Sequence, residues 1–144
     1  MAVTYDSIAY DEIELGLRKI INDEFKNVYI GNVFKMVGSE CIKINLESST
    51  SIEQATNYEQ RDYNVNIRYY HTVNTNNELI NKSVKKKIDM LRKHLLDNQV
   101  NTTYKWAALI INDINYNIED EENEGNSNLH IAEFSISIQH HNTF

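Results

Sequence analysis

Two adjacent stretches decide the fold of this chain, RDYNVNIRYY (61–70) and NELINKSVKKKIDMLRKHLLD (77–97). In the first, inward-facing residues alternate with Asn64, Asn66 and Arg68, which is the two-residue period of a half-buried strand. The inward positions are Tyr63, Val65, Ile67 and Tyr69. In the second, apolar residues recur every three or four positions, as on a helix with one buried face. This stripe consists of Ile80, Val84, Ile88, Leu91 and Leu95. The two stretches therefore predict a strand followed by a long amphipathic helix.

A shorter helix is predicted near the start of the chain. Asp11 and Glu14 have the D-x-x-E spacing of a capping box, so we expect the helix to begin at Asp11. It should end or become exposed near Asn22, because Glu24 would otherwise enter the apolar stripe. The stripe consists of Ile13, Leu17, Ile20 and Ile21. Leu15 points to the opposite side, and we expect ordinary exposure there; in an assembling protein it would be a contact candidate.

Residues 28–40 precede a predicted strand at 41–46. Residues 28–40 hold two apolar pieces separated by Gly31-Asn32, a turn-permissive pair that fits a short hairpin or an irregular crossing. The run CIKINL (41–46) then alternates, with Ile42, Ile44 and Leu46 inward. Cys41 is expected to be a small packing residue.

Residues 47–61, ESSTSIEQATNYEQR, are almost entirely polar. A segment of this length between two strands is too long for a tight turn. It is either a mobile loop or an arm, a strand extension that becomes ordered against a neighbour. On the second interpretation Ile52, Tyr58 and Arg61 are contact candidates.

The last part of the chain predicts a long antiparallel hairpin closed by the acidic loop 119–128. In WAALIINDINYNIED (106–120) five residues share one parity, with Asn112 interrupting them: Ala108, Ile110, Ile114, Tyr116 and Ile118. In LHIAEFSISIQHH (129–141) the inward positions are Ala132, Phe134, Ile136 and Ile138. Leu129 and Ile131 have the opposite parity, which indicates a bulge near Ile131.

The element order is helix, strand, strand, helix, strand, strand. This order predicts a single α+β domain over residues 1–144, with two amphipathic helices packed on one face of an antiparallel sheet. One cysteine excludes a disulfide framework and any multi-cysteine metal site. The first residues lack the features of a signal peptide, and no apolar run is long enough to span a bilayer, so we expect a soluble intracellular protein.

The sequence shows no catalytic, cofactor or metal motif: no glycine-rich phosphate loop, no H-E-x-x-H, no nucleophile elbow and no EF-hand spacing. His140 and His141 are adjacent on a strand and should point to opposite faces, so they are poorly placed to share a metal. The acidic run is expected to be a solvated loop that contacts a partner. It contains Glu119, Asp120, Glu121, Glu122 and Glu124.

The lysines of 77–97 fall on the polar side of the predicted helix. Lys82, Lys86 and Lys93 lie opposite the apolar stripe, and Asp89 can pair with Lys85 or Lys93. A solvated face is the favoured interpretation, followed by a weak phosphate contact and then by an acidic patch on a neighbouring subunit. The acidic run of an identical subunit could supply that patch.

The order of these elements resembles that of the tail terminator and tail-completion (head–tail joining, neck) proteins of tailed bacteriophages. The resemblance rests on a leading helix (DEIELGLRKIINDEF), a strand pair spanning a long polar insertion, RDYNVNIRYY running into a long helix, and a final hairpin ending in AEFSISI.

The resemblance implies a virion protein, assembled in the host cytoplasm, that is not an enzyme and needs no cofactor. Its subunits form a ring, typically a hexamer, that caps the tail tube and joins it to the head-side neck or head-completion protein, with the sheath as a further contact. DNA passes through such a ring without sequence reading, and a net charge of −7 suits that passage because it repels the duplex.

Three alternatives stay open. The chain could be another neck, head-completion or connector protein. It could be a small-ligand binding module or enzyme that uses Tyr69, Tyr116 and His71, although nearly all inward strand positions are apolar. It could bind nucleic acid through the lysine helix, which the net charge disfavours.

Overall fold

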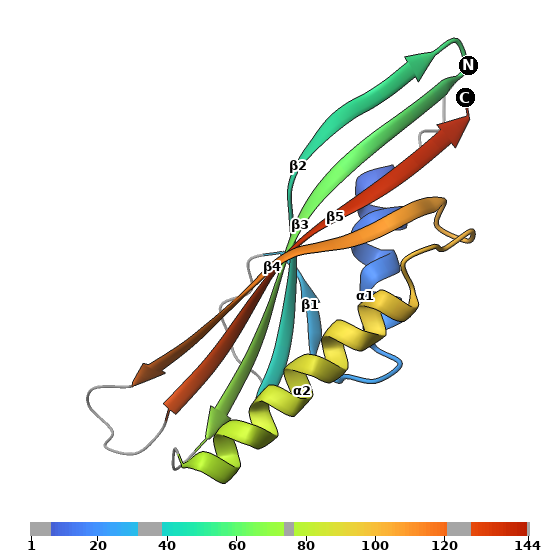
Figure 1. The fold of residues 1–144 in the computed structure, drawn as a ribbon. Helices are drawn as coiled ribbons and strands as arrows, with labels where there is room; N and C mark the ends of the chain where they lie inside the picture. The colour runs from blue at the N-terminus through green and yellow to red at the C-terminus, as the bar shows by residue number, and fades with distance from the viewer. Residues whose placement is uncertain (1–6, 32–38, 74–76, 121–127, 144) are drawn as a thin grey trace.

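Five strands form one sheet in the order β1-β2-β3-β5-β4 (Figure 1). The computed structural model describes residues 7–31, 39–73, 77–120 and 128–143. The strands are β1 (Val28–Ile30), β2 (Glu40–Ala55), β3 (Tyr58–Val73), β4 (Trp106–Asp120) and β5 (Asn128–Thr143). The helices are η1 (Ile8–Glu14), which has the wider turns of a π-helix, α1 (Leu15–Ile21), which continues it, and α2 (Glu78–Asp97). The α+β class predicted from the sequence is confirmed.

The sheet is mixed rather than antiparallel. β1 pairs parallel with β2 through the register Val28–Ile42 to Ile30–Ile44, while all other pairs are antiparallel. The predicted element order is therefore wrong by one strand, because the first apolar piece of 28–40 forms β1. The second piece falls in residues 32–38, which lie outside the described residues.

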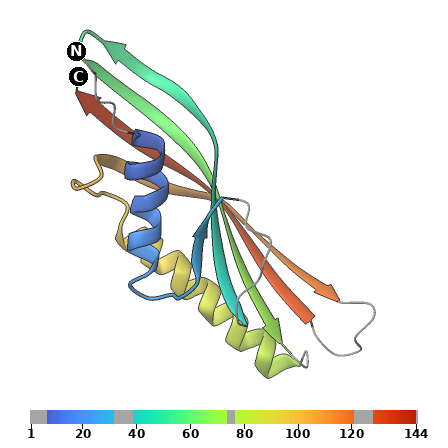
Figure 2. The same ribbon diagram turned by 180° about the vertical axis from the view of Figure 1, so that it is seen from behind.

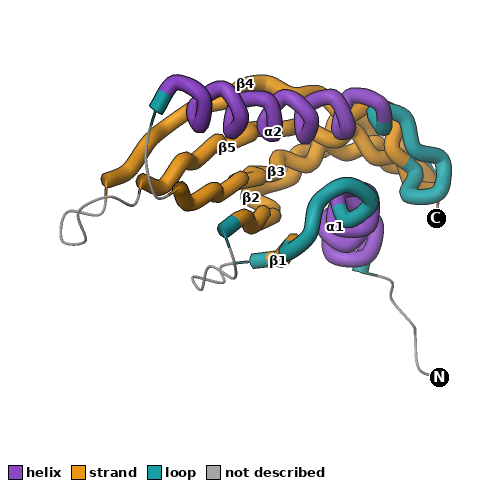
Figure 3. The backbone as a smooth tube through the Cα atoms, turned by 90° about the horizontal axis from the view of Figure 1, so that it is seen from below, coloured by secondary structure: helices purple, strands orange, loops and turns teal. Residues whose placement is uncertain are grey.

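β3 and β5 form the spine of the sheet. They pair from Tyr58–Thr143 to Val73–Asn128 without a register shift. Seen from either side, the strands fan out from a narrow waist, as in a strongly twisted sheet (Figures 1 and 2). α2 runs lengthwise along this sheet, and α1 lies near β1 (Figure 3).

One hydrophobic core joins the helices to the inward strand positions. The predicted stripes supply it: Ile13, Leu17, Ile20 and Ile21 from the first helix, Val84, Ile88, Leu91 and Leu95 from α2, and Ile42, Ile44, Val65, Ile67, Tyr69, Phe134, Ile136 and Ile138 from the strands. Cys41 is also fully buried. α2 begins where predicted, since the Asn77 side chain caps it by accepting from the backbone N–H of Ile80 at 3.0 Å.

The start of the first helix differs from its prediction. Helical structure begins at Ile8 after Ser7, and the backbone N–H of Asp11 donates to the carbonyl of Ser7 at 2.7 Å. Asp11 therefore lies inside the helix, and no side chain caps the start. The reason is that Ile8 and Ala9 also pack against the core, so the apolar face continues past the acidic residues.

The face predicted for β4 is right for Ile114, Tyr116 and Ile118 but wrong for Ala108 and Ile110. Bulges between Trp106 and Ala108 and between Ile111 and Asp113 insert extra residues that change which positions face the core. Ile110 therefore pairs with Ser137 on the open face, whereas Ile114 pairs with Phe134 on the core face. The bulge predicted near Ile131 is wrong, because Ile131 pairs in regular register with both Tyr70 and Asn117.

Candidate functional site

The polar stretch 47–61, which we call the arm, is the outer part of the β2–β3 hairpin. β2 continues to Ala55 and β3 begins at Tyr58, leaving a turn of Thr56 and Asn57. Across the hairpin, Arg61 Nε donates to Ser49 Oγ at 2.9 Å. The mobile-loop interpretation is thus wrong, and the strand extension is what forms. Its sequence is almost entirely polar because this part of the sheet extends past the helices, so neither face joins the core (Figure 1).

Ile52 is the most exposed of the predicted arm contacts. It is the extra residue of a bulge between Ser51 and Glu53, and half of its surface is accessible. Tyr58 and Arg61 are partly buried, and Arg61 forms an ion pair with Glu59 at 3.0 Å. The arm therefore presents one apolar side chain in polar surroundings.

Leu15 is less accessible than expected. It is half-buried rather than freely exposed. Leu15 is therefore a weaker contact candidate than the arm residues.

The lysine face of α2 is solvated, as predicted: Lys82, Lys86 and Lys93 are all exposed. Lys93 pairs with Asp97 at 3.1 Å rather than with Asp89. The acidic run can be placed only in part, since Glu119 and Asp120 end β4 opposite Leu129 and Asn128. Glu121, Glu122 and Glu124 lie outside the described residues.

A cavity of about 330 Å³ opens between the first half of α2 and the ends of β4 and β5 that lie beside it. Its lining is mainly apolar with a few polar groups: Asn81, Val84, Lys85, Ile88, Tyr116, Asn117, Ile118, His130 and Ile131. Tyr116 and Ile118 remain 52% and 44% exposed although they lie on the helix-facing side of β4. The core is therefore incompletely closed at this point.

His130 differs from the other residues that line the cavity, because it has a buried polar atom without a hydrogen-bond partner among the described residues. Its side chain is 95% buried, yet Nε2 has no hydrogen-bond partner among the described residues. Burial lowers the pKa of His130 below its ordinary value, and the charges of His71 and Lys85 act in the same direction. His130 thus lines the cavity with a buried ring nitrogen that lacks a partner among the described residues, which is costly unless another group reaches it.

The three polar groups predicted for a ligand site are not brought together. Tyr69 donates to Glu40 Oε2 at 2.5 Å and stacks on His71, while Tyr116 lies apart on the cavity wall. Burial, followed by the bond and charge of Glu40, raises the pKa of Tyr69. Tyr69 is fully buried, so this cluster anchors β2 to β3 rather than meeting a ligand.

Sequence reasoning missed His130 and Lys85 as site residues. The signal for His130 was present, because it shares the parity of Ala132 and Phe134 and so had to face the helices. No comparable signal marked Lys85, because only the packing of α2 on the sheet shows which lysine borders the opening.

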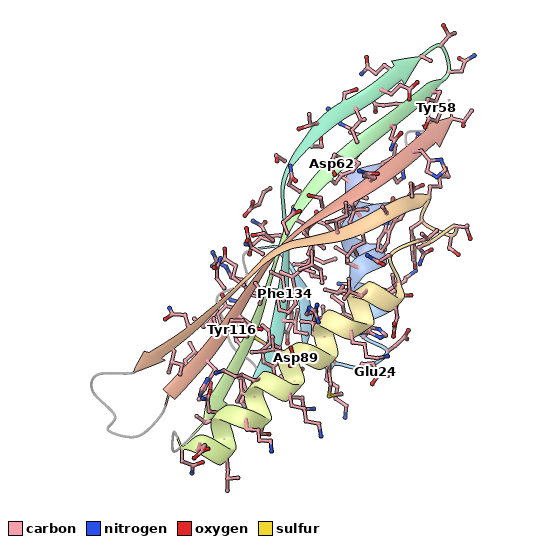
Figure 4. All side chains as sticks on the ribbon, in the orientation of Figure 1. Glu24, Tyr58, Asp62, Asp89, Tyr116 and Phe134 are labelled. Atoms are coloured by element: carbon pink, nitrogen blue, oxygen red, sulfur yellow. The ribbon has the colours of Figure 1, made fainter. Side chains whose placement is uncertain are left out.

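Two strand edges are open for pairing. Within the described residues, β4 has a neighbour on one side only, and β2 beyond the short β1 is likewise free on its outer edge. In the same part of the chain, no helix has the length and apolar character needed to cross a membrane, and no three His, Cys, Asp or Glu side chains gather as metal ligands. Figure 4 shows Tyr58 of the arm and Tyr116 of the cavity in opposite halves of the molecule. No protein-family model matches the chain, and a search of curated proteins finds no match.

Proposed function

We propose that this protein is a structural virion subunit that forms a homo-oligomeric ring at the head–tail junction of a tailed bacteriophage. In this role it is a tail terminator, which caps the tail tube and joins it to the head-side neck. The observation that carries the proposal is the contrast between the two halves of the molecule. One half extends an ordered polar arm, and the other exposes an apolar opening beside lysines. Two different surfaces on one chain suit a head-to-tail contact, which closes into a ring when the rotation allows it.

The open strand edges support the same proposal. Unpaired edges are a liability for a monomer, since they offer free N–H and C=O groups to other chains. The outer edges of β4 and of the arm lie on opposite sides of the sheet order, so neighbouring copies could cover both. The β-bulges in β2 and β4 disrupt these edges locally, and assembly would cover the rest.

The charge balance fits a channel through which DNA moves. The net charge of −7 repels a duplex, and the exposed lysines of α2 are too few to reverse this over the whole surface. We therefore expect no retention of duplex DNA at physiological salt. Salt-sensitive retention would favour the nucleic-acid alternative.

The direct test is assembly of the purified full chain at tens of micromolar. Light scattering and electron microscopy should show closed rings, and addition to a polymerising tail tube protein should stop tube growth at one end. A strict monomer, both alone and with the tube protein, contradicts the proposal. Rings that bind a neck protein but leave tube growth unchanged would identify another neck or connector protein instead.

A small-ligand binding module is the second candidate, and the cavity with His130 favours it. Pockets for small ligands combine apolar walls with a few oriented polar groups, and about 300 Å³ is the lower end of their range. A thermal-shift screen of small apolar carboxylates would test it, since such a ligand could place its carboxylate between Lys85 and His130. Saturable stabilisation that disappears in Ile118→Asp would support this candidate.

A further inference from the structure

The cavity beside α2 has the features of a site that another group completes. It is lined by the side chains of Val84, Ile88 and Ile118, and the Nε2 atom of His130 is buried without a partner among the described residues. Buried polar atoms are satisfied in the great majority of cases, so the expected occupant carries both an apolar group and a hydrogen-bonding group. The cavity therefore fits an amphipathic protein segment.

Charge narrows the choice of occupant. Lys85 lines the cavity, and Lys82 is exposed one turn earlier on the same helix. An acidic segment would gain from these two ammonium groups, whereas a basic one would be repelled. The occupant should therefore combine an apolar side chain with nearby carboxylates.

The arm of this chain has that composition. Ile52 protrudes at a bulge, Glu53 is exposed next to it, and Glu47 is exposed earlier on the same strand. Ser51, also exposed, adds a hydroxyl next to the apolar group. The arm thus offers an apolar anchor, negative charge and hydrogen-bonding groups within a few residues.

We propose that the cavity of one copy receives the arm of a second copy, with Ile52 as the anchor against Ile118 and Val84. The proposal rests on the ring function proposed above and names the contact that would build the ring. Ser51 or Glu53 then supplies the partner for His130 Nε2, and Lys85 meets the acidic side of the arm. A small buried anchor of this kind commonly carries much of an interface's binding energy.

The positions of the two surfaces set the geometry of assembly. The arm and the cavity lie in opposite halves of the sheet (Figure 4), so each copy that uses its arm still has a free cavity. Such a contact is heterologous and continues until the ring closes. Two copies that exchanged arms reciprocally would instead close into a two-fold dimer, so a wild-type dimer that grows no further contradicts the ring.

The test uses one variant on each surface. Ile52→Asp changes the arm, and Ile118→Asp changes the cavity at a residue that is already 44% exposed. Ile110→Asp is the matched control, because it is 43% exposed on the same strand but faces the other side of the sheet. Val100→Asp is a second control, because it removes an exposed apolar residue that follows α2 and belongs to neither the arm nor the cavity lining. Circular dichroism and thermal unfolding confirm that each variant is folded.

Each single variant should weaken self-association about tenfold or more, because an apolar anchor is replaced by a charge. The two control variants should associate as the wild type does. A mixture of Ile52→Asp and Ile118→Asp should form dimers and nothing larger, since one intact arm can enter one intact cavity. Rings that persist in both single variants overturn the inference while leaving the ring function in place.

Cross-linking keeps the test decisive when association is weak. In an Ile52→Cys and Ile118→Cys double variant, mild oxidation should produce disulfide-linked multimers, while Ile52→Cys with Ile110→Cys should not. The native Cys41 is fully buried and does not compete. Absence of cross-linked multimers overturns the arm-in-cavity contact. Loss of assembly in Ile118→Asp but not in Ile52→Asp also overturns it, because the cavity would then bind a segment other than the arm. A wild-type chain that never assembles, even with tube protein, contradicts the ring function itself.

Discussion

The carboxylate of Glu12 bonds the imidazole Nε2 of His140, 128 residues later in the chain, and fixes the first helix to the last strand. The same residue accepts, through its backbone carbonyl, the indole N–H of Trp106 at 2.8 Å. Lys105 approaches the carboxylate from outside at 3.6 Å. One residue of η1 therefore connects to both strands β4 and β5 at the base of the arm.

Removal of the Glu12 carboxylate should destabilise the fold. In Glu12→Ala the His140 side chain, 2% exposed, loses its partner, and we expect a loss of about 1–3 kcal/mol in the free energy of unfolding. Lys105→Ala is the matched control, because this half-exposed lysine makes only surface contacts, the pair with Glu12 and a 3.4 Å hydrogen bond to Asn142, and should cost less than about 1 kcal/mol. Urea unfolding measures both, and equal losses would show that the buried bond has no special weight.

The pH dependence of stability should report on His130. Its pKa is lower in the folded protein than the ordinary 6.5, so the unfolded chain binds the proton more readily. The contribution of His130 is therefore complete above pH 6.5 and is lost as the pH falls through the lower, folded-state pKa. His130→Gln should show a smaller fall in unfolding midpoint between about pH 8 and about pH 5 than the wild type.

The two proteins differ only at residue 130, so the difference between the two curves reports on His130 and its coupling to His71. His141→Gln, at an exposed site, provides the control for the substitution itself. Parallel curves for wild type and His130→Gln would mean that the imidazole is already protonated or well solvated in the folded protein.

Gly16→Ala should destabilise the protein even though alanine favours helices. The added methyl would lie 3.1 Å from the Tyr104 ring and 3.2 Å from Trp106 Cζ2, and the indole is held by its bond to Glu12. Overpacking costs about 1–3 kcal/mol, against a helix-propensity gain of about 1 kcal/mol. The net loss should thus reach up to about 2 kcal/mol. In a Tyr104→Ala background the substitution should cost less, and a double-mutant cycle without coupling would rule out this contact.

The turn of the arm depends on Asn57, whose φ of 67° lies in the left-handed region. Asn57→Val should cost about 1–2 kcal/mol locally, because a β-branched side chain resists this conformation, whereas Asn57→Gly should be tolerated. Hydrogen exchange of arm amides is the suitable measurement, since a hairpin end can open without global unfolding. Equal protection in both variants would indicate that the turn changes conformation freely.

The regular, amphipathic parts of this fold could be predicted from the sequence. The stripes of α2, β3 and β5 identify the core because burial on one face imposes a strict period on each element. The same approach failed for β4, where a bulge at Asn112 reverses the parity between Ile110 and Ile114. The position of a bulge cannot be read from the alternation of one strand, because it depends on how that strand pairs with its neighbour.

The arm and the cavity could not be predicted from the sequence, for a different reason. Residues 47–55 form a strand although almost all of them are polar. Pairing with β3 satisfies their backbone hydrogen bonds, so no pattern of buried residues is required. The polar composition of this segment is therefore the same as that of a loop, and the sequence does not distinguish the two. The cavity depends on how α2 approaches the β4–β5 ends, and that distance between elements is not encoded in the period of either one.

The uninterrupted pairing of β3 with β5 gives this subunit mechanical strength along one axis. A pull on the arm tip directed along the strands would act on the whole ladder from Tyr58 to Val73 in shear, so many hydrogen bonds would bear the load at once instead of separating one by one. The strand that receives the force at Tyr58 is the strand that ends beside the start of α2. Tension between two neighbouring subunits would therefore travel through the molecule along a single continuous backbone.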